Sequence, residues 1–168
     1  STGLGVSAKD RGTTTYELLH EYVALAAIIR PTATDGLHLA PATTDLSSTE
    51  VALADQAYRV FLLKDALAGN ALAAYDYVLI DRPPSLSLLT VNALVASDAV
   101  LVPLQAEFFA LEGLSQLMLT IRDVRETANP NLRIEGVVLT MVDQRNNLSQ
   151  QVEDDARATL GELVFQTR

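Results

Sequence analysis

The clearest candidate for chemistry is an acidic side chain, Asp81, which directly follows the four residues YVLI. A short apolar run of this kind is typical of a strand buried on both faces, and it would fix one carboxylate where the strand ends. Carboxylate oxygens are ligands that a hard cation such as Mg²⁺ prefers. The pattern indicates a Walker B acid that holds Mg²⁺, directly or through a water, beside nucleotide phosphates; the alternative is a residue that only caps the next turn.

The elements that must position Asp81 follow from hydrophobic periodicity and breaker residues. The strand YDYVLID should end at Pro83-Pro84, because proline cannot continue a central ladder. Further strands and helices then alternate down the chain. They are a helix from Ser85 to about Ala96, the strand DAVLVPLQ, a helix over 111–127, a strand over 132–141, a helix over 148–160 with Gly161 as its C-cap, and a strand begun by LVF.

The first half of the chain has weaker signals. Apolar residues at helical spacing predict one helix over 16–30, stopped by Pro31. A turn from Asp35 leads to a short strand that ends at Pro41, and Ser47 or Ser48 is the expected N-cap of the next helix. A second helical pattern over 58–74 is broken near Gly69-Asn70.

Buried strands that alternate with helices predict an α/β fold with a mostly parallel sheet flanked by helices. The length of 168 residues suits a single domain. Ligands of such sheets bind outside the carboxyl ends of the strands, so the residues that follow the strands are the candidates for a site.

Composition excludes several classes of protein. The chain has no cysteine, which rules out disulfides, thiolate metal sites and a cysteine nucleophile, and its two histidines are too scattered for a zinc site. A net charge of -9 argues against DNA binding through the overall field, although a local basic patch remains compatible with it. The most apolar stretch, over 86–106, is too polar to span a membrane, so no stable membrane insertion is expected.

Two long stretches resemble a known family. YDYVLIDRPPSLSLLTVNALVASDAVLVPLQAEFFALEGLSQL is similar to the Walker B segment, and the helix after it, of the ParA family of deviant Walker ATPases, which includes Soj and is related to MinD. GVVLTMVDQRNNLSQQV is similar to the segment that follows, and STGLGV and GLHLAPATTDLSSTEVAL also fit. The resemblance covers nearly the whole chain.

This resemblance implies a P-loop NTPase-like fold and an ATPase that uses ATP and Mg²⁺ in chromosome or plasmid partitioning. The ATP-bound homodimer of the family binds DNA non-specifically, and a ParB-type partner stimulates hydrolysis. A cytoplasmic, nucleoid-associated location follows. The resemblance makes Asp81 a metal residue that acts through water, places Met141 and Asp143 where the strand passes the adenine, and matches Arg145 to a basic position that contacts DNA.

Each of these residues has a structural alternative. Met141 would otherwise be a packing residue, Asp143 a turn cap, and Arg145 a solvated loop side chain. The charged groups of the two neighbouring predicted helices are expected to be solvated surface. They are Arg122, Asp123 and Arg125 in one helix, and Glu153, Asp154 and Asp155 in another.

The chain also departs from the family pattern. No G-x-x-x-x-G-K-[ST] phosphate loop occurs, and neither Lys9 nor Lys64 follows a glycine-rich turn. Arg82 stands where the family usually has a small residue or cysteine, and Val142 where it often has an aromatic. We therefore expect a partial domain, incomplete at both ends, with unpaired neighbouring strands and no appreciable ATPase activity alone. The alternatives are a MinD-like membrane-cycling ATPase and a non-enzymatic interaction module that has lost nucleotide binding.

Overall fold

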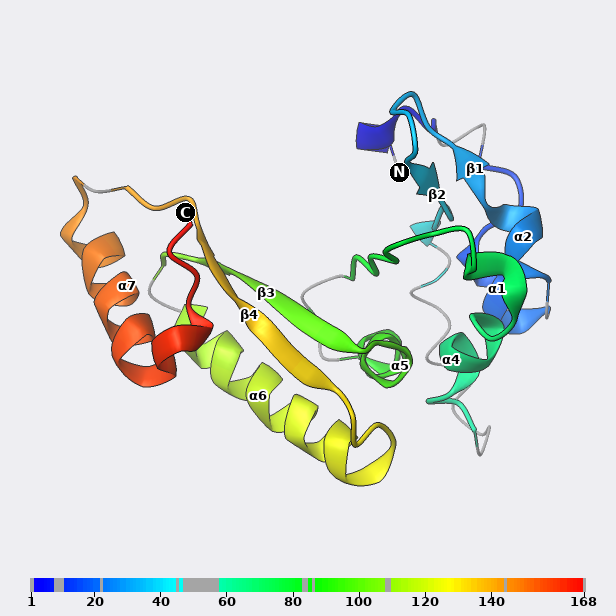
Figure 1. Cartoon of the computed structure of the whole chain (residues 1–168). Helices are drawn as coiled ribbons and strands as arrows, with labels where there is room; N and C mark the ends of the chain where they lie inside the picture. Colours follow the sequence, from blue (N-terminus) through cyan, green and yellow to red (C-terminus); the bar gives the residue numbers. More distant parts are fainter. Residues whose placement is uncertain are drawn as a thin grey trace. The chain divides into compact units, whose positions relative to one another are not determined.

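A computed structural model describes residues 2–7, 11–21, 23–44, 46, 58–82, 85, 87–107, 110–143 and 145–167. The chain divides into two compact units, Ser1–Ala96 and Ser97–Arg168. The first unit contains short helices and a short antiparallel strand pair, whereas the second contains a parallel strand pair and long helices (Figure 1).

The second unit has the α/β architecture that the sequence predicts. Strand β3 (Ala99–Gln105) pairs in parallel with β4 (Arg133–Thr140), and helix α6 (Ala110–Thr127) connects them. Helix α7 (Asn147–Leu160) and the 3-10 turn η5 (Gly161–Leu163) follow, and Val164 then forms a parallel bridge with Val137. These bounds lie close to the predicted ones, and the predicted C-cap Gly161 has a φ of 57°.

The core of the second unit consists of the buried face of α6 and the buried side chains of β3 and β4. Helix α6 buries Leu114, Leu117, Ile121 and Val124, which recur at the three- and four-residue spacing of one helix face. Strand β3 buries Val102 and Leu104, and β4 buries Val137 and Leu139. The helix ends before Pro130, and Arg125 Nε donates to the Leu132 carbonyl at 2.5 Å. Arg125 therefore braces the turn into β4 and is half-buried, contrary to the prediction of a solvated side chain.

The prediction of a solvated acidic run is also wrong for Glu153. Its side chain is only 7% exposed and accepts from Arg157 Nε at 3.0 Å. Arg157 Nη2 donates in turn to the Phe165 carbonyl at 3.3 Å, and the Phe165 N–H donates to the Val137 carbonyl at 2.9 Å. Asp154 and Asp155 are exposed as expected. Arg157, paired with Glu153, therefore connects α7 to Phe165, which is hydrogen-bonded to β4.

The first unit contains η1 (Thr2–Leu4), α1 (Thr15–His20), α2 (Leu25–Ile28), α4 (Leu62–Ala66), η4 (Asn70–Leu72) and α5 (Leu88–Ala96). Its strands β1 (Arg30–Pro31) and β2 (His38–Leu39) pair antiparallel, in a chain whose sheet was predicted to be mostly parallel. The single helix predicted over 16–30 is two helices, because Ala24 adopts an extended conformation between them. The break predicted at Gly69 is confirmed, with a φ of 105°.

Hydrogen bonds define the ends and contacts of these short helices. Thr14 caps α1: its hydroxyl oxygen accepts from the Tyr16 N–H at 3.2 Å, and its own N–H donates to Glu17 Oε2 at 2.8 Å. Asn92 of α5 is buried, accepts from the Leu63 N–H at 3.1 Å, and so joins α5 to α4. The apolar cluster of this unit centres on Leu18, Leu25 and Ile28.

The strand predicted at YVLI is not present in the structure. Residues 75–82 have no strand conformation, and Tyr77 and Leu79 are 86% and 90% exposed. A strand buried on both faces requires hydrogen-bonded neighbours as well as apolar side chains. Among the described residues of the first unit, the only ladder is the pair β1–β2, so this segment has no neighbouring strand. Pro83, Pro84, Ser47 and Ser48 lie outside the described residues.

Candidate functional site

The carboxyl ends of β3 and β4 form one edge of the parallel sheet. Gln105 and Thr140 are register partners at that edge, and the Ala106 N–H donates to the Thr140 carbonyl at 3.2 Å. Both strands end here, and the polypeptide continues from them toward the N-termini of α6 and α7 (Figure 1). This is the edge at which parallel α/β sheets bind their ligands.

The carbonyl of the same residue, Ala106, also holds the start of α7. Ser149, in the first turn of that helix, donates from Oγ to the Ala106 carbonyl at 3.2 Å, and both residues are 4% exposed. Asn146 is the N-cap, since its side-chain oxygen accepts from the Leu148 N–H at 3.0 Å. The loop from β4 to α7 is therefore attached to Ala106 at both ends. Sequence patterns gave no sign of this, because a serine in a first turn is common.

Asp143 and Arg145 lie together in this loop. Asp143 Oδ1 accepts from the Arg145 backbone N–H at 2.9 Å and from Arg145 Nε at 3.3 Å. The backbone hydrogen bond, followed by the side-chain one, holds the pKa of the Asp143 carboxyl below its usual value. The structure shows Asp143 in the turn-capping role, while the side chain of Arg145 is 92% exposed.

Met141 begins the loop in an unusual conformation. Its φ is 55°, the left-handed region that residues with a Cβ adopt only at a cost of about 1–2 kcal/mol. Its side chain is 78% exposed, which does not fit the alternative of a packing residue. The backbone turn thus directs an apolar side chain into solvent at the carboxyl edge of the sheet.

The loop after β3 adds a carboxylate to this edge. Gln105 Nε2 donates to Glu107 Oε1 at 2.6 Å, and the Glu107 N–H donates to the Gln105 carbonyl at 2.8 Å. Both side chains are exposed. The edge therefore presents Glu107, Met141 and Arg145 to solvent, from two loops that meet at Ala106.

Asp81 belongs to the first unit and is exposed. Because no strand precedes it, the structure does not hold its carboxylate at the end of a strand, and its predicted metal role stays a prediction. Among the described residues, no group of three or more His, Cys, Asp or Glu side chains is arranged to hold a metal ion.

A triphosphate needs more than these groups provide. A phosphate loop uses several backbone N–H groups, a lysine and a helix N-terminus. Lys64 is the one lysine in the described part of the chain, and it lies in the short helix α4. Among the described residues, this lysine does not follow a glycine-rich turn.

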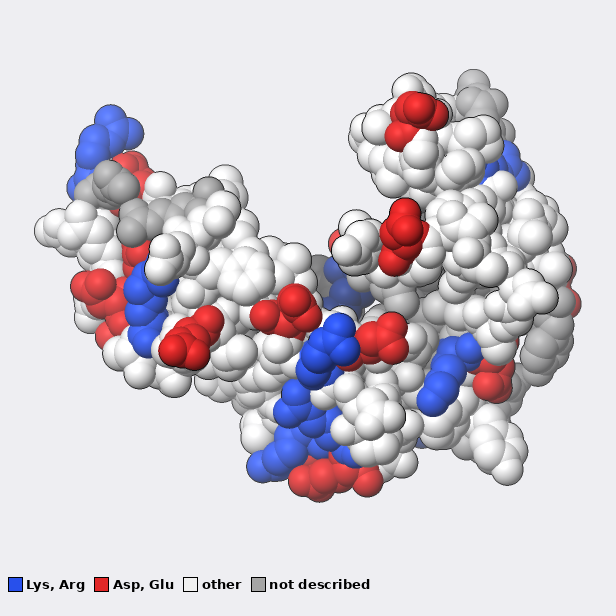
Figure 2. All heavy atoms as spheres, viewed as in Figure 1, with Lys and Arg blue, Asp and Glu red and all other residues white. Residues whose placement is uncertain are grey.

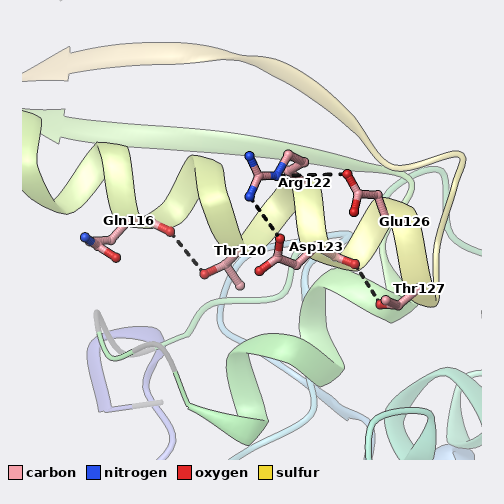
Figure 3. A network of polar contacts seen from close by, with 6 residues as sticks. All are labelled: Gln116, Thr120, Arg122, Asp123, Glu126 and Thr127. Atoms are coloured by element: carbon pink, nitrogen blue, oxygen red, sulfur yellow. Dashed lines mark hydrogen bonds and ion pairs between the residues drawn. The ribbon is translucent and has the colours of Figure 1, made fainter.

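The exposed face of α6 differs from the edge of the sheet. Arg122 contacts Asp123 at 3.5 Å and Glu126 at 4.0 Å, while the Thr120 and Thr127 hydroxyls donate to carbonyls of their own helix (Figure 3). Both ion pairs are well solvated, which confirms the predicted mixed surface. On the face drawn in Figure 2, basic side chains lie among acidic ones in the same way.

Membrane insertion was not expected from the sequence. In the ranges that the structure describes, no helix combines the length and the hydropathy that crossing a bilayer requires.

Comparison with known sequences places these features in context. Residues 1–134 match the family model described as an AAA domain. The chain is 53% identical over 166 residues to the chromosome partitioning protein ParA of Caulobacter vibrioides, covering 98% of this chain and 62% of that protein. It is 42% identical over 167 residues to the sporulation initiation inhibitor protein Soj of Bacillus subtilis, covering 99% and 66%. The chain thus spans less than two thirds of the length of these relatives.

Solved structures agree on the fold. Cobyrinic acid a,c-diamide synthase from Mycobacterium smegmatis, with bound ADP and magnesium, aligns with a TM-score of 0.82 and 37% identity over 96% of this chain and 65% of its own. A plasmid partition protein from Borrelia burgdorferi aligns with a TM-score of 0.74 and 26% identity over 97% of this chain and 65% of its own. The predicted α/β fold is confirmed by these alignments and by the parallel pair β3–β4.

Proposed function

We propose that this chain, which belongs to the AAA domain family and is a homologue of the ParA and Soj partitioning proteins, serves as part of a DNA-partitioning ATPase. The observation that carries the proposal is the loop between β4 and α7. It presents the guanidinium of Arg145, 92% exposed, at the ligand edge of a parallel sheet. Residues 1–168 then form part of a single nucleotide-binding domain.

Arg145 is the proposed DNA contact. A guanidinium on a loop held by hydrogen bonds can approach a phosphate at little conformational cost, and phosphate contacts carry no sequence information. Binding through this side chain is therefore non-specific, even though the overall charge is -9. On α6, Arg122 contacts two carboxylates, those of Asp123 and Glu126, whereas Arg145 contacts that of Asp143.

ATP and magnesium are proposed for the protein as a whole. Asp81 supplies the side chain toward the metal, through water, and Met141 and Asp143 lie toward the base. The exposure of Met141 supports this placement, since an apolar side chain in solvent gains by covering a ring. An ATP-bound homodimer, a ParB-type partner and a cytoplasmic, nucleoid-associated location complete the proposal.

Non-specific DNA binding is tested with Arg145→Ala in the native protein that contains this chain. We expect weaker binding of a duplex of arbitrary sequence, and a salt dependence reduced by roughly one phosphate contact. Fluorescence anisotropy across a salt series measures both. The matched control is Arg122→Ala, which removes an exposed arginine of α6. Equal effects of the two substitutions would contradict the assigned contact.

The role of Asp81 is tested by ATP hydrolysis. In the native protein, Asp81→Ala should abolish magnesium-dependent turnover, whereas Asp65→Ala, at an acidic residue of α4, should leave it intact. Residues 1–168 expressed alone should show no appreciable turnover. Magnesium-dependent turnover by that fragment, lost on Asp81→Ala, would overturn the expectation that it cannot hydrolyse ATP by itself.

A further inference from the structure

The backbone of one residue, Ala106, anchors both ends of the loop that carries Arg145. The Ala106 N–H donates to the Thr140 carbonyl at the loop's start, and the Ala106 carbonyl accepts from Ser149 Oγ just beyond its end, each at 3.2 Å. Ala106 and Ser149 are separated by 43 residues in sequence, so only the fold brings them together.

The two anchoring hydrogen bonds differ in whether they depend on a side chain. The bond from Ala106 to Thr140 joins backbone to backbone and continues the ladder of β3 and β4. The bond from Ser149 is made by a side chain, in a place where both residues are 4% exposed and water cannot easily replace the hydroxyl. A single substitution can therefore release one end of the loop and leave the other attached.

We propose that Ser149 is a positioning residue for Arg145, holding the first turn of α7 against the end of β3 so that the loop presents the guanidinium in one orientation. The inference rests on the proposed function, in which Arg145 contacts DNA. Releasing this anchor lets the first turn of α7 shift relative to Ala106. The turn in which Arg145 N–H and Nε donate to Asp143 Oδ1 would then lose its fixed geometry.

The first test is DNA affinity of the native protein carrying Ser149→Ala. We expect affinity for a non-specific duplex to fall about three- to tenfold, the range for one hydrogen bond. The matched control is Ser115→Ala, because the Ser115 hydroxyl donates only within α6, to the Leu111 carbonyl at 2.9 Å. Ser149→Thr, which keeps a hydroxyl, should recover part of the affinity.

A double-mutant cycle separates positioning from general destabilisation. If Ser149 acts through Arg145, then Ser149→Ala should cause no further loss of affinity in an Arg145→Ala background. A loss of the same size in both backgrounds would overturn the proposal, as would unchanged affinity of the single Ser149→Ala variant.

A readout without DNA decides the inference even if the protein does not bind DNA. In Ser149→Ala, NMR titration should show the pKa of Asp143 shifted back toward its usual value, because the Arg145 N–H no longer donates to it in a fixed turn. Ser115→Ala should leave that pKa unchanged. An Asp143 pKa that is the same in Ser149→Ala as in the native protein would refute the positioning role. A protein with the predicted shift but no DNA affinity would refute only the proposed function.

Discussion

The same sequence pattern has opposite outcomes in the two units of this chain. In the second unit, the apolar run over 137–139 forms the middle of β4, with Val137 and Leu139 fully buried. In the first unit, the equally apolar run over 77–80 has no strand conformation, and Leu79 is 90% exposed. The run over 137–139 has β3 beside it, whereas the run over 77–80 has no neighbouring strand among the described residues. An apolar run therefore becomes a strand only where a partner satisfies its backbone.

The largest expected effect tests this difference directly. Leu139→Ala should destabilise the fold by about 2–5 kcal/mol, because it leaves a cavity beside β4. The matched Leu79→Ala should change stability by less than about 0.5 kcal/mol, because the side chain is already in solvent. Urea denaturation of both variants, followed by circular dichroism, measures the two values. A large cost for Leu79→Ala would show that the two runs are alike in solution.

The outcome also shows how far sequence reasoning reaches. The bounds of β3, β4, α6 and α7 lie within one residue of prediction, because each element agrees with its own period and its breakers. Contacts that depend on the fold were not predicted. Glu153 was expected in solvent and is buried beside Arg157. No sequence pattern predicted that Ser149 would bond to Ala106, which directly follows β3. Periodicity describes one element, whereas the bond from Ser149 to Ala106 and the bond from Arg157 to the Phe165 carbonyl each join two segments.

In the candidate site, too, the sequence predicted the location of the loop but not the contacts within it. The sequence directed attention to the loop after β4, because residues that follow parallel strands gather at one edge. It could not show that Met141 adopts a left-handed φ or that Asp143 caps the turn of Arg145. Asp81, the residue with the strongest pattern, lacks the strand that would fix it, because strand pairing is a property of two segments.

The second prediction compares ion pairs within the second unit. Glu153→Gln should destabilise the fold by about 1.5–3 kcal/mol, the range for a hydrogen bond to a charged group, because Glu153 is buried and its partner also holds the Phe165 carbonyl. Glu126→Gln on the exposed face of α6 should cost less than about 0.5 kcal/mol. Thermal melts at low and high salt measure both. A cost for Glu153→Gln that disappears in high salt would mean that the pair is solvated.

The third prediction concerns the segment paired with β4. A Cβ on Gly136 would collide with the Phe165 ring, so Gly136→Ala should cost about 1–3 kcal/mol by overpacking. Gly113→Ala, in an open position on α6, should instead stabilise by about 0.5–1 kcal/mol, because glycine is unfavourable inside a helix. Urea midpoints distinguish the two signs. A neutral Gly136→Ala would show that Phe165 does not pack on the strand.

The smallest expected effect lies in the first unit, where short helices depend on their caps. Thr14→Ala should cost about 1 kcal/mol, because it removes the hydroxyl that caps α1. Thr120→Ala is the control, since that hydroxyl donates only within α6.

The hydrogen bonds from Thr14, its side chain first, also lower the pKa of Glu17. A lowered carboxyl pKa adds stability above its unfolded value, roughly pH 4.3, and that stability is lost as the pH falls through the folded value. Thr14→Ala should therefore flatten the loss of stability of the first unit on acidification, which a series of melts from neutral to acidic pH would reveal. An acid transition with the same slope in both proteins would mean that another carboxyl governs it.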